Sequence, residues 1–236
     1  MADDFAHGSR VRGTLPLFPL GTVLMPGASL PLHIFEPRYR QLTVDLVTGT
    51  VPDKQFGVIA VREGWTADDD GLDGLHPVGC TAELRDVRRL PDGRFDLVTR
   101  GARRFRLLEL DPESKPYLIG TVEYLPDAEP TTIAEDLTRM LVAAARDAHR
   151  RYCDTAWKQG DWTEPEPDVA PGLLPHVLAA DCLLPVDDRQ KLLEQTSPTQ
   201  RLRMVRAMLC REAGLLSQLR AVPAPMTSFA VDHSYN

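Results

Sequence analysis

At 236 residues, the chain is long enough to form one large domain or two small ones with a sizeable buried core. Hydrophobic residues make up 43% and charged residues 26%, a balance typical of a globular protein and not of a disordered one. The net charge of −7 disfavours sequence-independent binding to nucleic acid, because that binding needs a positive surface. No apolar run has the length of a membrane span and the start of the chain lacks the pattern of a signal peptide, so we expect a cytoplasmic protein with no membrane partner.

Two short apolar runs, at residues 15–20 and 30–35, begin the strand-like part of the chain. Each run is broken by proline, and the turn Met25-Pro26-Gly27 separates them. Proline removes a hydrogen-bond donor from a sheet and fixes φ. The runs are therefore predicted to be edge or bulged strands of a closed, irregular β-structure, and we expect them to leave an open strand edge.

A helix is predicted directly after the second run. Glu36-Pro37 places proline where a first helical turn tolerates it, and Gly49 provides a stop. Between them, apolar residues recur at spacings of four, three and four. These residues are Phe35, Tyr39, Leu42 and Leu46.

Strand-like runs continue to residue 125. The tripeptide Pro91-Asp92-Gly93 predicts a hairpin between strands at 78–90 and 94–100, because proline presets the turn and glycine accepts a positive φ. Phe95, Leu97 and Thr99 alternate with Arg94, Asp96 and Val98, a period of two that indicates a half-buried strand. Gly101 is expected to break this run before another at 103–110, and the last strand is expected at 117–125.

A change of composition at residues 126–130 predicts a boundary, beyond which the pattern is helical. A capping box at Thr132 and Glu135 begins a long helix that extends toward Tyr152, and a proline-rich acidic linker is expected at 158–172. Shorter helices are predicted at 174–184 and 187–195, and a long last helix after the cap at Ser197. The predicted organisation is a disordered lead-in (1–13), a β-subdomain (14–126), a helical subdomain (127–220) and a tail (221–236).

The opening phrase LPLFPLGTVLMPG…LPLHIFEPRYRQL resembles the N-terminal substrate-binding domain of Lon protease, in the form found in bacterial proteins that consist of that domain alone. The blocks FGVIAV, VGCTAEL, PDGRFDLVTRGARRFRL and PYLIGTVEYL follow in the family's order. The resemblance implies an α+β fold: a PUA-like pseudo-β-barrel of about six or seven strands with an inserted helix, followed by a C-terminal helical bundle.

The resemblance also implies a non-catalytic module that binds unfolded or exposed polypeptide segments and uses no cofactor. The sequence contains no GxxxxGK[ST] phosphate-binding motif and no GxSxG nucleophile motif, so we expect neither ATPase nor serine-hydrolase activity and name no catalytic residue. Polypeptide binding is assigned to the opening runs, the first helix and two arginines of the β-subdomain. The residues are Leu30, Leu32, Phe35, Glu36, Arg38, Tyr39, Arg103 and Arg104.

The charged members of this set have two interpretations. Glu36 and one of the arginines would form a bidentate pair that fixes the first helix against the barrel. Alternatively, Arg38 or Arg103 faces a groove and receives a polypeptide carboxylate or carbonyl group.

The four cysteines show no CxxC pair, so the sequence predicts no metal site. We expect them to be reduced and mostly buried. His149 and Cys153 are four residues apart and share a helical face, for which packing is favoured over a thiol nucleophile.

Two other functions remain open. One is an adaptor that docks on a separate protease or other protein through the helical bundle. The other is a small-ligand or RNA-binding protein with a basic cleft near Arg103, a function that the acidic composition disfavours.

Overall fold

The computed structural model describes residues 11–62, 64, 71–128, 135–157 and 161–219. It forms two compact units, one made of Met1–Ala128 with Val186–Thr196 and the other of Glu129–Pro185 with Ser197–Asn236. Most of the predicted lead-in, the predicted tail and the Thr132 cap lie outside the described residues.

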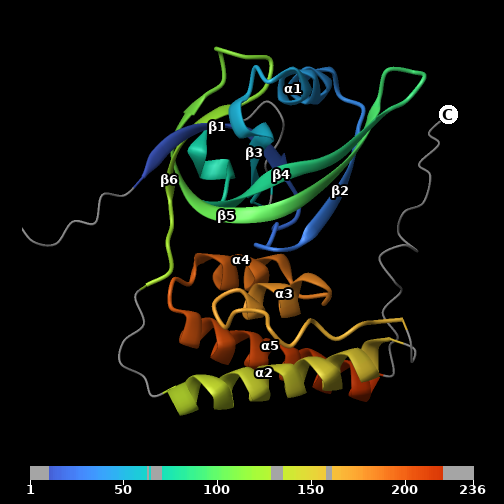
Figure 1. The fold of residues 1–236 in the computed structure, drawn as a ribbon, viewed down its shortest axis with the longest axis vertical. Coiled ribbons are helices and arrows are strands. Elements are labelled where there is room, and N and C mark those ends of the chain that lie inside the picture. The colour runs from blue at the N-terminus through green and yellow to red at the C-terminus, as the bar shows by residue number, and fades with distance from the viewer. Residues whose placement is uncertain (1–10, 63, 65–70, 129–134, 158–160, 220–236) are drawn as a thin grey trace, which may run out of the picture. The chain divides into compact units, whose positions relative to one another are not determined.

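The first unit is built on a closed ring of strands (Figure 1). The strands β1, β3, β4, β5 and β6 follow one another around the ring, and β6 pairs with both β1 and β5. A further strand, β2, pairs only with β5. The predicted α+β fold with an inserted helix is thus confirmed. The bounds are β1 Arg12–Leu20, β2 Ser29–Ile34, β3 Gln55–Ala60, β4 Val78–Arg89, β5 Phe95–Asp111 and β6 Ile119–Tyr124.

β1 carries two prolines and lies between β3 and β6 in the ring, so residues 15–20 are not the free edge strand that the sequence predicted. Its first half pairs with β6 and its second half pairs with β3, in parallel. β1 changes partner along its length, so each half makes strand-pairing hydrogen bonds on one side only. The lack of an N–H group at a proline is tolerated on the unpaired side. The apolar side chains then fill the ring, with Leu17, Ile59 and Phe105 fully buried.

β5 runs without interruption through Gly101, which the sequence had indicated as a break. The Gly101 nitrogen donates to the Ala28 oxygen at 2.8 Å, and its oxygen accepts from the Gly27 nitrogen at 2.8 Å. A Cβ atom at this position would lie 2.1 Å from the Met25 oxygen. Glycine therefore serves here to let the loop between β1 and β2 approach the strand closely.

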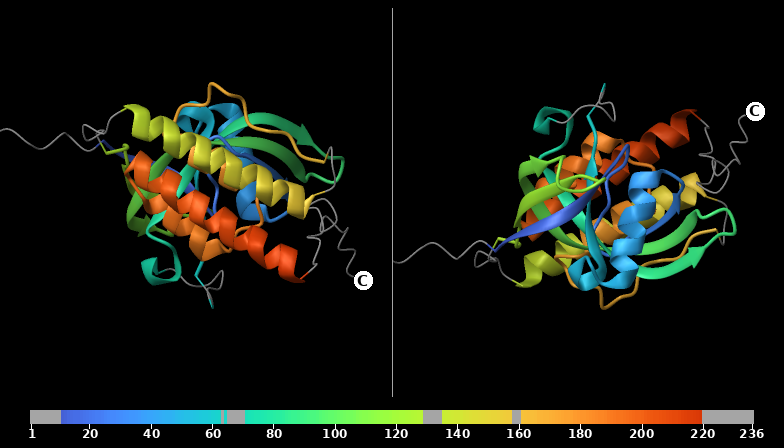
Figure 2. Two further views of the ribbon diagram at one scale, coloured as in Figure 1. Left: turned by 90° about the horizontal axis from the view of Figure 1, so that it is seen from below. Right: turned by 90° about the horizontal axis from the view of Figure 1, so that it is seen from above.

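The inserted helix α1, Pro37–Thr48, lies across one end of the barrel (Figures 1 and 2). It begins with proline after Glu36 and ends at Gly49, whose φ of 82° is the left-handed conformation predicted for a helix stop. Tyr39, Leu42 and Leu46 are buried, and the Tyr39 ring stacks on Phe18 with centroids 4.0 Å apart. Short 3₁₀ turns at Pro52–Lys54 and Leu72–Gly74 flank β3.

The helix α4, Val186–Glu194, also belongs to the first unit. Leu192 and Leu193 are buried, and the Gln190 side chain donates to the Val78 oxygen at 3.0 Å. The second half of the chain thus contributes one helix to the barrel unit.

In the second unit, α2 (Glu135–Ala156) and α5 (Pro198–Leu219) lie side by side, and the short helix α3 (Leu174–Ala180) packs against both (Figure 2). The predicted cap at Ser197 is present, because the Ser197 hydroxyl accepts from the Gln200 nitrogen at 3.4 Å. Both long helices carry fully buried small and aliphatic side chains. They include Ala145, Ala148, Leu202, Val205 and Leu209.

The close approach at Gly101 gives a stability prediction. Gly101→Ala would place a methyl group against the Met25 carbonyl, which is backbone and cannot rotate away, so we expect the free energy of unfolding to fall by about 1–3 kcal/mol. Gly21→Ala is the matched control, because a Cβ atom there meets nothing within 4 Å. Thermal denaturation of both variants tests this, and equal melting temperatures would contradict it.

Candidate functional site

An open groove of about 670 Å³ lies between α1 and the hairpin that joins β4 to β5. Its apolar surface comes from valines of α1 and from residues near the hairpin, while arginine and glutamine side chains border it. Val44 and Val47 are 41% and 51% exposed, so the helix presents apolar side chains on the face opposite its buried one. The lining residues are Pro37, Arg40, Gln41, Val44, Val47, Thr48, Val87, Arg89, Gly93 and Phe95.

The turn of the hairpin helps to shape this groove. Gly93 has a φ of 83°, which glycine adopts without strain, and a Cβ atom there would lie 2.9 Å from an Arg40 guanidinium nitrogen. The turn and the first part of α1 are therefore in close contact at one end of the groove. Hydrophobic walls bordered by a few hydrogen-bonding groups are the chemistry of a site for small or extended ligands.

A smaller hollow of about 150 Å³ lies at the junction of β2 and α1. Of the residues predicted for polypeptide binding, Leu32, Phe35, Glu36 and Tyr39 line it. Phe35 is 61% exposed, so most of this large apolar side chain is in contact with water. The other lining residues are Phe18, Leu20, His33 and Ile34.

β2 provides the strand edge that the sequence predicted for residues 30–35. It pairs with β5 on one side only, from Ser29 opposite Arg100 to Ile34 opposite Phe95. Pro31 has no backbone donor, which suits an edge strand and limits how regularly a further strand can pair there. Leu30 and Leu32 are half-buried on this strand.

Charged side chains connect β2 to the hairpin strands. The His33 ring bonds to Asp96 at 2.7 Å, and Arg88 pairs with the other oxygen of Asp96 at 2.5 Å. The hydrogen bonds from Arg88 and His33 hold the pKa of Asp96 below its usual range. This network lies on the exposed side of the strands, so its contribution to stability is small.

The position of α1 depends on a buried carboxylate. Asp45 Oδ2 accepts from the Tyr117 hydroxyl at 2.6 Å, and Oδ1 accepts from the Gln41 amide at 2.7 Å. Lys115 lies 3.8 Å from the same carboxylate. Burial, together with the bond to Asp45, raises the pKa of Tyr117 above its usual range. The segment just before β6 therefore fixes the helix by directional bonds, in addition to the apolar contacts.

The structure settles how Glu36 is paired. Arg38 donates to Glu36 Oε2 from Nε at 3.0 Å, and its Nη2 lies 2.8 Å from the same oxygen. The pair is therefore local, and the expectation that it fixes the helix against the barrel is wrong. The Arg38 guanidinium also lies 4.8 Å from the centre of the Tyr39 ring, whose pKa burial raises to about 12. Arg38 is therefore bonded to Glu36, which lines the small hollow, but Arg38 itself lines neither hollow.

Arg103 and Arg104, adjacent on β5, have opposite surroundings. Arg103 is exposed and lies 3.5 Å above the centre of the Tyr124 ring, and it lines neither hollow. Arg104 is buried and donates to the Leu193 and Gln195 carbonyls at 2.8 Å and to Asp127 at 2.7 Å. Because these bonds hold α4 to the barrel, Arg104 is not offered to a ligand and is left out of the proposed binding surface.

Sequence reasoning missed the groove residues of α1. The signal was present, because Pro37, Gln41, Val44 and Thr48 recur at helical spacing on the face opposite Tyr39, Leu42 and Leu46. A valine on such a face is most often an isolated exposed residue. The hairpin that forms the other wall is more than forty residues away in the chain, and only the fold brings it opposite α1.

The fold and its hollows define an α+β barrel domain with an open groove and an exposed strand edge. The chain belongs to the family of the ATP-dependent protease La (LON) substrate-binding domain, whose model matches residues 14–211. The predicted family is thereby confirmed.

Individual relatives agree with this assignment. The chain is 29% identical over 210 residues to the Lon protease of Anaeromyxobacter dehalogenans strain 2CP-C, a match that covers 87% of this chain and 24% of that protein. It is 35% identical over 130 residues to the Lon protease of Parabacteroides distasonis, covering 54% and 15% of the two chains. The chain therefore spans a quarter or less of the length of these relatives.

Solved structures show the same fold. A crystal structure of a Lon N-terminal domain protein from Xanthomonas campestris is 25% identical, with a TM-score of 0.59 over 83% of this chain and 98% of that one. The N-terminal domain of Mycobacterium avium complex Lon protease is 21% identical, with a TM-score of 0.61 over 84% and 98%. Among the described residues, no helix has the length and apolar character required to cross a membrane.

The Asp45 contact gives the second prediction. In Tyr117→Phe the buried carboxylate loses its strongest donor, so we expect a loss of about 1.5–3 kcal/mol in the free energy of unfolding. Tyr124→Phe, which removes a hydroxyl from a half-buried tyrosine, should change it by less than about 0.5 kcal/mol. Urea denaturation measures both, and equal effects would show that Asp45 does not depend on this bond.

The different surroundings of the neighbouring residues Arg103 and Arg104 give the third prediction. Arg104→Met would leave the carbonyls at the end of α4 without their donor, and we expect a loss of about 3 kcal/mol with faster amide exchange in α4. Arg103→Met removes only a cation–π contact worth about 1 kcal/mol or less. Exchange rates in α4 that match in the two variants would rule out the proposed role of Arg104.

Proposed function

We propose that the barrel unit binds extended, apolar segments of unfolded or partly exposed polypeptides in the groove between α1 and the β4–β5 hairpin. The observation that carries this proposal is the exposed pair Val44 and Val47, which lines the groove opposite Phe95 and Val87. Isolated exposed valines need no explanation, but apolar side chains that gather around one hollow do.

The chemistry of the borders supports a polypeptide ligand. Arg40, Arg89 and Gln41 offer hydrogen-bond donors beside the apolar walls, and a peptide backbone presents a carbonyl acceptor at every residue. The free edge of β2 and the hollow beside Phe35 give a second contact region at the other end of the Glu36-Pro37 turn. Leu30, Leu32, Phe35, Glu36 and Tyr39 belong to this second region. Arg38 is bonded to Glu36 beside it, and Arg103 is a separate exposed position.

The proposed role is recognition without bond cleavage. The chain carries neither the phosphate-binding motif of an ATPase nor the GxSxG motif, and the matched family is described as a substrate-binding domain. Degradation or unfolding of a bound polypeptide would then be carried out by other residues than those of this domain.

Binding to a model polypeptide tests the proposal. The probe is a small disulfide-containing protein that is reduced and alkylated so that it stays unfolded, with its folded form as reference. Val44→Asn with Val47→Asn removes apolar surface without adding charge, and asparagine and valine have similar helix propensities. We expect at least a 10-fold weaker affinity for the unfolded probe by fluorescence anisotropy, equivalent to about 1.4 kcal/mol.

The matched control is Met140→Asn with Leu215→Asn, which removes two exposed apolar side chains of the second unit. Met140 on α2 is 68% exposed and Leu215 on α5 is 45% exposed. Its affinity should equal that of the unchanged protein. If the probe binds no better unfolded than folded, or if the α1 variant binds as tightly as the control, the groove is not the binding site.

The same pair of variants tests the adaptor alternative. Met140 and Leu215 are apolar side chains that the helical unit exposes, and docking through these helices would depend on such residues. A loss of probe or partner binding in the control, with the α1 variant unaffected, would move the binding function to the helical unit.

A further inference from the structure

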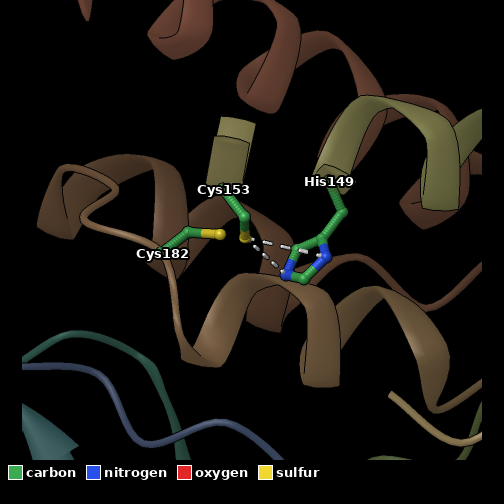
Figure 3. A group of neighbouring side chains, drawn as sticks. All are labelled: His149, Cys153 and Cys182. Atoms are coloured by element: carbon green, nitrogen blue, oxygen red, sulfur yellow. Dashed lines mark hydrogen bonds between the residues drawn. The ribbon is translucent and has the colours of Figure 1, made fainter. Parts of the chain in front are cut away.

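Three potential metal ligands meet inside the second unit. His149 and Cys153 lie one turn apart on α2, and Cys182 follows α3 (Figure 3). One ligand atom from each lies within 4.8 Å of the others, and all three side chains are buried. Within the described part of the chain, no other set of three histidine, cysteine or acidic residues is so close. The expectation of buried, reduced cysteines holds for Cys80, Cys153 and Cys182, whereas Cys210 is exposed.

The separations match the geometry of a tetrahedral metal site. With Zn–S bonds of about 2.3 Å and Zn–N bonds of about 2.0 Å, tetrahedral ligands lie about 3.6 Å apart for sulfur and nitrogen and about 3.8 Å apart for two sulfurs. Cys153 Sγ is 3.5 Å from His149 Nε2. The largest distance between two of the three ligand atoms exceeds the tetrahedral distance by at most about 1 Å. Small side-chain rotations can remove this difference.

The surrounding structure holds the three ligands in place. Beside Cys182, the Leu183 nitrogen donates to the Tyr152 hydroxyl at 2.9 Å, which ties this turn to α2. The Trp162 ring packs edge-on against His149 with centroids 5.8 Å apart. Such outer contacts fix the orientation of ligands before a metal binds.

The segment that carries Trp162 is itself tied to α2. Arg146, one turn before His149, donates to the carbonyls of Pro165 and Glu166 at 2.7 and 2.6 Å. The histidine side of the cluster is therefore enclosed by a segment bonded to the same helix.

The charges also suit a divalent ion. Two thiolates and a neutral imidazole around Zn²⁺ sum to zero, so the complex can be buried without an unpaired charge.

We propose that His149, Cys153 and Cys182 bind one thiophilic divalent cation, Zn²⁺, with a fourth position open to water or another small ligand. The sequence predicted no metal site because Cys182 is 29 residues from Cys153 and no CxxC pair is present. The site would join α2 to the turn after α3 and would have a structural role in the helical unit.

The test uses the full chain, reduced with a phosphine and stripped of metal with a chelator. We expect Zn²⁺ to bind one per chain in competition with a chromogenic chelator, and to raise the melting temperature. Co²⁺ should give thiolate-to-metal charge-transfer absorption. That absorption should halve in Cys153→Ser and in Cys182→Ser, and Zn²⁺ affinity should fall at least about 100-fold, beyond the effect of losing an outer contact.

Cys210→Ser is the matched control, because Cys210 lies in the same unit but is exposed and outside the cluster. It should bind Zn²⁺ as the unchanged protein does. A measurement on the unchanged protein covers the case of a variant that fails to fold: Zn²⁺ should protect two of the buried thiols from alkylation while Cys210 continues to react.

Three results would overturn the proposal. One is a reduced protein that binds no more Zn²⁺ than the folded Cys153→Ser/Cys182→Ser double variant. The second is protection of Cys210 instead of Cys153 and Cys182. A Cys153–Cys182 disulfide that forms in air, with no metal uptake after its reduction, would replace the metal site with a redox pair. Because these residues lie in the second unit, failure here leaves the polypeptide-binding proposal for α1 unaffected.

Discussion

The proposed binding surface depends on the buried carboxylate of Asp45. The apolar contacts of Tyr39, Leu42 and Leu46 supply area buried from water, but the hydrophobic effect has no direction and does not by itself set how α1 is rotated. The hydrogen bond from the Tyr117 hydroxyl to Asp45 does set the rotation of α1, because it is short, buried and made to a charged acceptor. The rotation of α1 in turn decides that Val44 and Val47 face outward.

That outward face costs the domain some stability, since two valines remain partly in water at about 25 cal/mol per Å² of apolar surface. A polar residue at either position would avoid this cost without disturbing the buried face of α1. The hairpin turn at Gly93 encloses the same surface from the other side, so the exposed apolar area lies in a groove and not on a convex surface. A concave apolar surface is protected from general aggregation and remains open to an extended chain.

The sequence predicted the features that local rules determine. The Pro91-Asp92-Gly93 turn, the proline start and glycine stop of α1, and the Ser197 cap of α5 each follow from a few adjacent residues. It did not predict the role of Gly101, because the reason for glycine there is the Met25 carbonyl, more than seventy residues earlier. From the sequence alone, a glycine in a strand is interpreted as a break. Where another backbone segment approaches closely, the same glycine instead allows the strand to continue.

Charged and sulfur-containing residues show the same limit in a stronger form. The residues next to Arg103 and Arg104 in the sequence do not show that one is exposed and the other donates to carbonyl groups at the end of α4. The acceptors, Leu193 and Gln195, lie far along the chain. The helical spacing of His149 and Cys153 correctly places them on one face, but two ligands do not make a metal site. The third ligand comes from a turn whose position is set by the bond between Leu183 and Tyr152, a contact between elements that no spacing rule describes. Both proposed sites therefore depend on where separate local structures meet, and those meeting points are visible only in the fold.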